Sequence, residues 1–215
     1  MPALTLPSSS LAMVRKLPQS FTTVMPELER VRMNDVSLML TQATVYNEQQ
    51  RIIGLVLHDL LSHASTWPLP ASFVSKDALI ALWRKNGGDP SGFDAALKEL
   101  GRLLFMLQQS THAKRIFDSD AKVVWREKAF YVPKHRGVRK IVMDRVIQHP
   151  DGTWWVIEFK SMHQKSLSKE QEHDYYAQVQ DYIQVLTNYL NTTVRGSLYF
   201  IADDSIVDIE PTIES

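Results

Sequence analysis

The chain has 215 residues, of which 44% are hydrophobic, so it is long enough to bury one substantial core. Its 24 Lys and Arg residues balance 24 Asp and Glu residues, so no global basic field draws it to nucleic acid, and any DNA contact must depend on local clusters. The sequence has no cysteine, which excludes disulfides, thiolate zinc sites, a cysteine nucleophile and cysteine-ligated iron–sulfur clusters.

Residues 1–26 are predicted to form an extended arm or linker, because prolines and a serine run interrupt them repeatedly. They lack a basic segment followed by an apolar one, and no apolar run in the chain approaches the roughly 20 residues of a membrane span. We therefore expect a cytoplasmic protein without membrane association. A single domain is predicted over residues 27–215, with a helical portion at 27–115 and a sheet core at 116–215.

A helix is predicted to begin at Asn47 and to carry His58. Its apolar residues run from Ile52 to Leu61 on nearly all sides, so the helix should be buried. His58 follows Gly54 by one turn, on the same face. The residues leave two interpretations open: a histidine satisfied within the core, or an imidazole that serves as a metal ligand beside carboxylates.

Two further helices are predicted, from Ser75 to about Asn86 and from about Ser91 to Gln109. A strand follows from Val123 to Val132. Glu127 in this strand is either a surface charge or a carboxylate close to the site described next.

Residues 139–147 and 153–160 are predicted to form a β-hairpin, because both are rich in β-branched or aromatic residues. Pro150-Asp151-Gly152 between them is a turn signal, since proline presets φ and glycine accepts a positive φ. A turn centred on Asp151 makes opposed residue numbers add to 302, which sets Asp144 opposite Glu158. Alternation then puts Glu158 and Lys160 on one face, and the other face of the second strand is expected to be core.

Two apposed carboxylates repel each other, and a divalent cation between them would remove the repulsion. The alternative is an ordinary surface salt bridge of Asp144 with Arg145 or Lys160.

A long helix is predicted from about Ser168 to Asn191, with Gln178 and Tyr182 one turn apart, followed by strands at 194–201 and 206–209. Two basic clusters flank the hairpin and could meet phosphates, although solvated loops carry such charges too. They consist of Lys134, His135, Arg136, Arg139 and Lys140, and of His163, Lys165 and Lys169.

The order Gly-x-x-x-His, Asp, Glu-x-Lys, Gln-x-x-x-Tyr resembles the PD-(D/E)xK nuclease superfamily, and its RecB/AddA branch most closely. The resemblance implies an α/β fold with a restriction-endonuclease-like mixed central sheet flanked by helices. It implies one or two Mg²⁺ or Mn²⁺ ions held by His58, Asp144, Glu158 and the backbone carbonyl of Phe159. Lys160 would join Asp144 and Glu158 as a catalytic residue. Gln178 and Tyr182 would position DNA, and Glu127, Arg139 and Lys140 are further candidates for the site.

The function implied by this resemblance is a metal-dependent deoxyribonuclease of DNA repair and recombination, with exonuclease action on single-stranded DNA or DNA ends. Residues 14–18 resemble the connector that follows the helicase motor of AddA-type enzymes. The sequence has no phosphate-binding loop, so we expect the chain not to bind ATP. A helicase partner, if there is one, would then be a separate subunit. Glu158 stands where AddA-type domains more often have Asp. The alternatives are an inactive DNA-binding or helicase-docking remnant, and a restriction-type endonuclease, which would need a dimer and a base-reading element.

Overall fold

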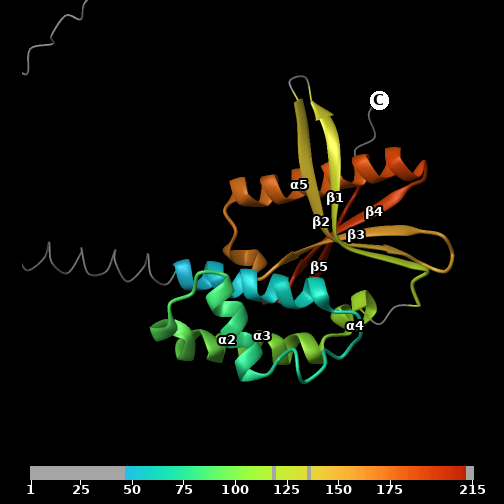
Figure 1. The fold of residues 1–215 in the computed structure, drawn as a ribbon. Helices are drawn as coiled ribbons and strands as arrows, with labels where there is room; N and C mark the ends of the chain where they lie inside the picture. Colours follow the sequence, from blue (N-terminus) through green and yellow to red (C-terminus); the bar gives the residue numbers. More distant parts are fainter. Residues whose placement is uncertain (1–46, 118–119, 135–136, 212–215) are drawn as a thin grey trace, which may run out of the picture. The chain divides into compact units, whose positions relative to one another are not determined.

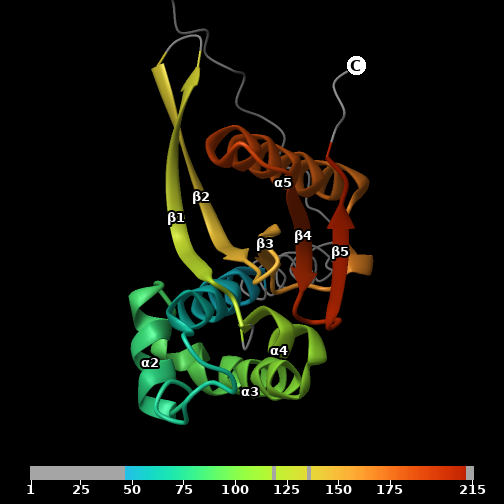
Figure 2. The same cartoon turned by 90° about the vertical axis from the view of Figure 1, so that its right-hand side faces the viewer.

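The computed structural model describes residues 47–117, 120–134 and 137–211. In this part of the chain, a five-stranded sheet is covered by helices on both faces, as Figures 1 and 2 show. The predicted α/β class and mixed, helix-flanked sheet are confirmed. The extended segment predicted at residues 1–26 lies outside the described residues. The predicted boundaries at residues 27 and 115 stay predictions.

The helical portion of the described chain begins with a helix at residues 47–63. It continues through α2 (Lys76–Lys85), the 3₁₀ turn η1 (Pro90–Gly92), α3 (Phe93–Gln109) and α4 (Thr111–Phe117). The predicted cap Ser75 is confirmed, since its hydroxyl accepts a hydrogen bond from the N–H of Ala78. Sequence reasoning missed α4, which has seven residues and is too short to show a helical stripe. None of the helices in the described segments is both long and apolar enough to span a membrane.

The sheet has the order β1-β2-β3-β4-β5. Its strands are β1 (Val123–Lys134), β2 (Gly137–Gln148), β3 (Trp154–Lys160), β4 (Val194–Phe200) and β5 (Ser205–Ile209). β1, β2 and β3 form an antiparallel meander. The chain then passes through the 3₁₀ turn η2 (Gln164–Ser166) and α5 (Lys169–Leu190) to β4, which is parallel to β3, and β5 returns antiparallel. The helix α5 is therefore the crossover that a parallel pair of strands requires.

The predicted register of the β2–β3 hairpin is confirmed. Arg145 pairs with Ile157 and Gln148 pairs with Trp154, so the numbers in each pair add to 302. In the turn, Gly152 has a φ of 90° and donates its N–H to the carbonyl of His149 at 3.0 Å. The positive φ explains why glycine stands at this position.

Each face of the sheet has its own core. Trp155, Ile157 and Phe159 pack with the helices of the N-terminal portion, whereas Trp154 and Val156 pack under α5. The alternation is as predicted, but the expectation that only one face is core was incomplete. A central strand of an α/β sheet is covered on both sides, so Glu158 ends a buried face and does not lie on an open surface.

Arg145 is fully buried on the helical side of the sheet, with 2% of its surface exposed. Its guanidinium donates to the carbonyls of Ile116 and Ala64 at 3.2 and 3.3 Å and lies 4.4 Å from the centroid of the Phe117 ring. Burial lowers the pKa of Arg145 to about 10, which leaves it charged at neutral pH. It ties α4 and the preceding helical region to β2, and it does not form the surface salt bridge with Asp144 considered above.

We predict opposite effects of one substitution at two glycines. A Cβ at Gly196 on β4 would lie 2.6 Å from Ile183 Cδ1 and 2.7 Å from Val179 Cγ1 of α5, whereas a Cβ at Gly101 on α3 would meet nothing within 4 Å. Gly196→Ala should lower the free energy of unfolding by about 1 to 3 kcal/mol through overpacking. Gly101→Ala should raise it by about 0.5 to 1 kcal/mol because alanine favours helix. Urea unfolding measures both, and equal changes would contradict the tight α5–β4 contact.

Candidate metal centre

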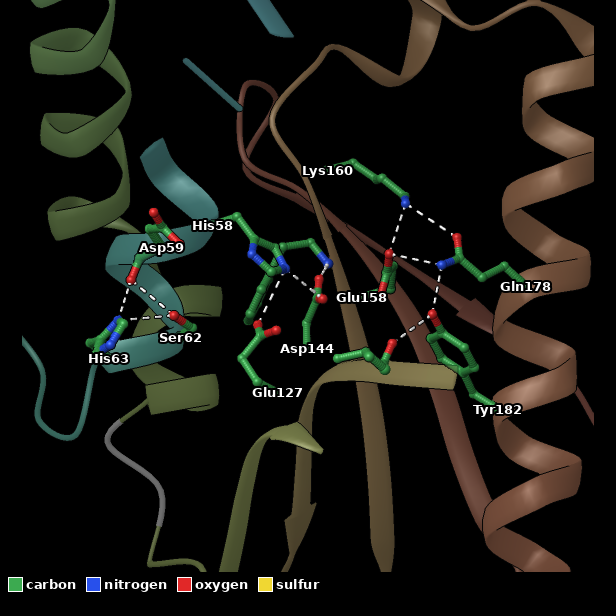
Figure 3. Close-up of polar contacts among 12 residues, drawn as sticks. His58, Asp59, Ser62, His63, Glu127, Asp144, Glu158, Lys160, Gln178 and Tyr182 are labelled. Atoms are coloured by element: carbon green, nitrogen blue, oxygen red, sulfur yellow. Dashed lines mark hydrogen bonds and ion pairs between the residues drawn. The ribbon is translucent and has the colours of Figure 1, made fainter. Parts of the chain in front are cut away.

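Three neighbouring strands each bring a carboxylate to the same level of the sheet. By the β1–β2 register, Glu127 lies opposite Asp144. The two residues are not themselves paired, because the pairing skips from Arg126 with Arg145 to Lys128 with Met143. Glu127 has a φ of 49°, a local break in the strand. The β2–β3 pairing ends at Arg145 with Ile157, so Asp144 and Glu158 are the next residues along the two strands. The carboxylates thus gather where β2 and β3 stop pairing (Figure 3).

His58 reaches this cluster from the helix at residues 47–63. Its Nε2 lies 2.7 Å from Asp144 Oδ1 and 3.3 Å from Glu127 Oε1. One ligand atom from each of these three residues lies within 4.8 Å of the other two. Asp144 Oδ2 accepts the backbone N–H of Phe159 at 2.9 Å, which fixes the carboxylate against β3. His58 therefore contacts the carboxylates and is not an isolated core histidine.

Glu158 is held by cationic and amide groups on the α5 side of the sheet. Its Oε1 accepts hydrogen bonds from Lys160 Nζ at 2.9 Å and from Gln178 Nε2 at 3.1 Å. Gln178 also accepts from Lys160 and donates to the hydroxyl of Tyr182, which in turn donates to the carbonyl of Val142. Glu158 Oε2 is buried and has no hydrogen-bond partner among the described residues. A buried carboxylate oxygen without a partner is costly, so it is a natural place for a cation to bind.

The pKa values in the cluster are raised by burial and by neighbouring carboxylates. Burial and the nearby Asp144 carboxylate raise the pKa of Glu158, and burial raises the pKa of Glu127. The hydrogen bond to Asp144 raises the pKa of His58 to about 9. In each case the fold favours a bound proton at a place where a divalent cation could supply the positive charge instead.

The donor set suits a divalent cation. The imidazole nitrogen of His58 and carboxylate oxygens of Glu127 and Asp144 lie close enough to bind one ion. The partnerless Oε2 of the buried Glu158 is a further carboxylate donor. Mn²⁺ accepts mixed nitrogen and oxygen ligands of this kind, whereas Mg²⁺ prefers oxygen ligands alone. The cluster also borders a groove of about 540 Å³, lined by Gly54, Leu55, His58, Glu158, Lys160 and Met162 among others. A ligand can therefore reach the carboxylates from solvent.

The structure brings together most of the predicted site residues and separates the rest. The residues that meet are His58, Glu127, Asp144, Glu158, Lys160, Gln178 and Tyr182. Arg139 instead pairs with Asp181 on α5, and Lys140 is exposed on the other side of β2. In the second basic cluster, His163 pairs with Asp203. His135, Arg136 and the side chain of Lys134 lie outside the description.

One neighbour of the site was not identified from the sequence. The Lys160 ammonium lies 4.1 Å from the centroid of the Tyr175 ring, a contact that the helical spacing of Tyr175 and Gln178 could have suggested. A Cβ at Gly54 would come 2.8 Å from Ser161 Oγ at the end of β3. Glycine at position 54 therefore lets the helix that carries His58 approach β3 closely.

Comparisons with known proteins give one match to a family. A family model described as the PD-(D/E)XK nuclease superfamily matches residues 35–213. No curated protein matches the chain in sequence. Two similar solved structures are a candidate exonuclease from Eubacterium rectale, with 13% identity and a TM-score of 0.42, and a protein designated SSO0001, with 19% identity and a TM-score of 0.32. The alignments cover 65% and 74% of this chain but 57% and 65% of the two relatives, a likeness too distant to carry an argument about function.

We predict that the His58–Asp144 interaction makes stability depend on pH when metal is chelated. The pKa of His58 is 6.5 in a free side chain and about 9 in the fold, so its stabilising effect is complete below pH 6.5 and is lost as pH rises through 9. Because 36% of the His58 side chain is exposed, we discount the full shift and expect a loss of about 1 to 2 kcal/mol.

The measurement is urea unfolding in EDTA from pH 6 to 9.5, for the wild type and for His58→Gln. The difference in unfolding free energy between the two should shrink as pH rises. Parallel curves over this range would show that His58 and Asp144 do not interact in the folded protein.

Proposed function

The chain belongs to the PD-(D/E)XK nuclease superfamily, and on that premise we propose that it is a divalent-metal-dependent deoxyribonuclease that hydrolyses phosphodiester bonds. The observation that supports this proposal is the convergence of His58, Asp144, Glu158 and Lys160 at one end of β3. A protein that only bound DNA would gain nothing from burying two carboxylates side by side, because they repel both each other and phosphate.

His58, Asp144 and Glu158 would hold the cation, with the carbonyl of Phe159 as a further ligand. The carbonyl of Lys160 accepts the N–H of Ile201 beside β4, so the backbone groups of Phe159 point the opposite way, toward β2. The Phe159 N–H does so, because it donates to Asp144. Its carbonyl then faces the same side, where the carboxylates gather. Glu127 is a fourth side chain within reach of His58.

When bound, the cation lowers the pKa of a coordinated water and offsets charge on the scissile phosphate. Lys160 would orient that water or donate a hydrogen bond to the phosphoryl oxygen on which charge develops. Gln178 forms hydrogen bonds with Lys160, Glu158 and Tyr182. It would therefore hold the Lys160 ammonium in position beside the DNA strand that is cut. Tyr182 is anchored by Val142 and supports Gln178.

Within this proposal, the substrate is single-stranded DNA or DNA ends, the mode is exonucleolytic, and the role is in repair or recombination, as in the RecB/AddA branch. A helicase partner in trans stays a prediction. The competing function is that of an inactive DNA-binding or helicase-docking remnant. Against it, Lys160, Glu158 and the supporting Gln178 are all present and in mutual contact. Asp144 is held nearby by His58 and the Phe159 N–H.

We expect Lys160→Ala to lower the rate of DNA cleavage by roughly a hundredfold or more, the scale of losing one preorganised electrostatic group. Binding should change far less, because one phosphate contact alters the salt dependence of affinity by about one unit of slope. Glu158→Ala should abolish cleavage while leaving metal-free binding unchanged or tighter. Lys98→Ala, an exposed lysine on α3, is the control and should cleave like the wild type.

The measurement is digestion of end-labelled single- and double-stranded DNA with Mn²⁺, beside binding of the same DNA in EDTA. If the wild type leaves DNA intact while it and both site variants bind equally well, the protein is the remnant and not the enzyme.

We also predict that Mn²⁺ supports cleavage at least as well as Mg²⁺, because an imidazole ligand suits Mn²⁺ better than Mg²⁺. His58→Ala should weaken Mn²⁺ binding by at least about tenfold, since it removes a direct ligand. Calorimetric titration measures this. His173→Ala, an exposed histidine on α5, is the control. Unchanged affinity in a folded His58→Ala variant would remove His58 from the ligand set.

A further inference from the structure

β1 and β2 continue beyond the rest of the sheet as a two-stranded ribbon. β2 pairs with β3 only from Arg145 to Gln148, whereas its pairing with β1 runs on to Lys134 and Gly137. Residues 128–143, here called the arm, therefore have no third strand among the described residues. Figures 1 and 2 show the arm extending past α5.

The two faces of the arm differ. One face rests on α5, where the rings of Phe130 and Tyr189 meet edge to face at 5.3 Å and Arg139 pairs with Asp181. Alternation turns the next residue, Tyr131, to the opposite face, where it stands directly across from Lys140. Tyr131 is 69% exposed, so this face is open to a partner.

The charge of the arm is of one sign. Its sequence contains Lys128, Lys134, Arg136, Arg139 and Lys140 and no aspartate or glutamate, in a chain whose formal net charge is zero. Among the described cationic side chains, Arg139 is offset by Asp181, whereas Lys140 is exposed beside Tyr131 on the open face. Lys128 is also exposed, but it lies at the base of the arm on the same side as Phe130, with its ammonium 5.5 Å from the centroid of the Trp125 ring. An exposed ribbon with lysines and an exposed tyrosine is complementary to a polyanion and much less so to another copy of a neutral chain.

We propose that the arm binds duplex DNA on one side of the scissile phosphate, with Tyr131 and Lys140 on its open face and Lys128 at its base as its contacts. This inference rests on the nuclease function proposed above and specifies its substrate as DNA with a duplex segment beside the cleaved strand. A two-stranded β-ribbon fits the major groove, which is about 12 Å wide.

The arm starts at the metal centre, which sets the distance between duplex contact and cleavage. Glu127 and Asp144 end the arm at its base. A strand rises about 3.4 Å per residue and duplex DNA about 3.4 Å per base pair. Lys140 lies four residues from Asp144 and Gly137 seven, so the arm spans about four to seven base pairs from the scissile phosphate.

The base of the arm and the catalytic groups share one groove. A groove of about 360 Å³ lies between β2 and α5 and is lined by Lys140 and Val142 from the arm and by Gln178 and Tyr182 from the site. This groove lies on the α5 side of the arm and joins its base to Gln178, which contacts Lys160.

The test is binding of the full chain, in EDTA, to a duplex of 16 base pairs and to a single strand of the same length, chosen to be about twice the span of the arm. In Lys128→Ser/Lys140→Ser, duplex affinity should fall about tenfold or more, and the plot of log affinity against log salt should become shallower by about two units. Tyr131→Ser should also weaken duplex binding. Lys98→Ser/Lys114→Ser removes two exposed lysines from α3 and α4 and is the matched control, which should bind like the wild type.

With Mn²⁺ present, the double variant should lose about tenfold more cleavage on a tailed duplex than on a short single strand, and duplexes under about seven base pairs should not show the difference. Unchanged duplex affinity and salt slope would overturn the proposal, as would equal losses on duplex and single strand. A concentration-dependent mass that the arm variants abolish would assign the arm to a second copy instead. Because binding is measured without metal, a protein that binds duplex through the arm but cleaves nothing would disprove the nuclease function alone.

Discussion

The repulsion between carboxylates on three adjacent strands is the constraint on which the rest of this structure depends. Glu127, Asp144 and Glu158 lie at one level of the sheet, and two of them are buried. Such a set is unfavourable unless positive charge and hydrogen-bond donors surround it. The fold supplies His58 from one face and Lys160 from β3 itself. Burial and the neighbouring carboxylate raise the pKa of Glu158, and the hydrogen bond to Asp144 raises that of His58, which makes the cluster a candidate site for a cation.

The two faces of the sheet contribute different parts of the site. The helical portion provides the imidazole, and the contact of Gly54 with the end of β3 brings that helix close enough. Arg145 holds the same helical layer against β2 through backbone carbonyls. The other face provides α5, which presents Gln178 to Glu158. Asp144 connects the two halves, because it contacts His58 with one oxygen and the backbone of β3 with the other.

The interruption of strand pairing at Asp144 serves both the site and the arm. Beyond this residue β2 leaves β3 and stays with β1 alone. Polar backbone and side-chain groups at the break are free to face a ligand, as they could not within a continuous ladder. The same departure carries the cationic ribbon away from the sheet. The proposed cleavage site and the proposed contact with duplex DNA therefore both follow from one irregularity in the sheet.

The sequence by itself determined the longer helices, the five strands and the hairpin register. Turn chemistry at Gly152 and strict alternation in β3 fix which residues oppose each other, because a slip of one residue would turn the core face outward. Only the tertiary structure decided that His58 meets Asp144, since 86 residues separate them and local periodicity carries no information about such a contact. It also decided that Glu127 joins the cluster, through a break in β1 that no propensity indicates. Local chemistry specified the strands, and packing between layers specified the site.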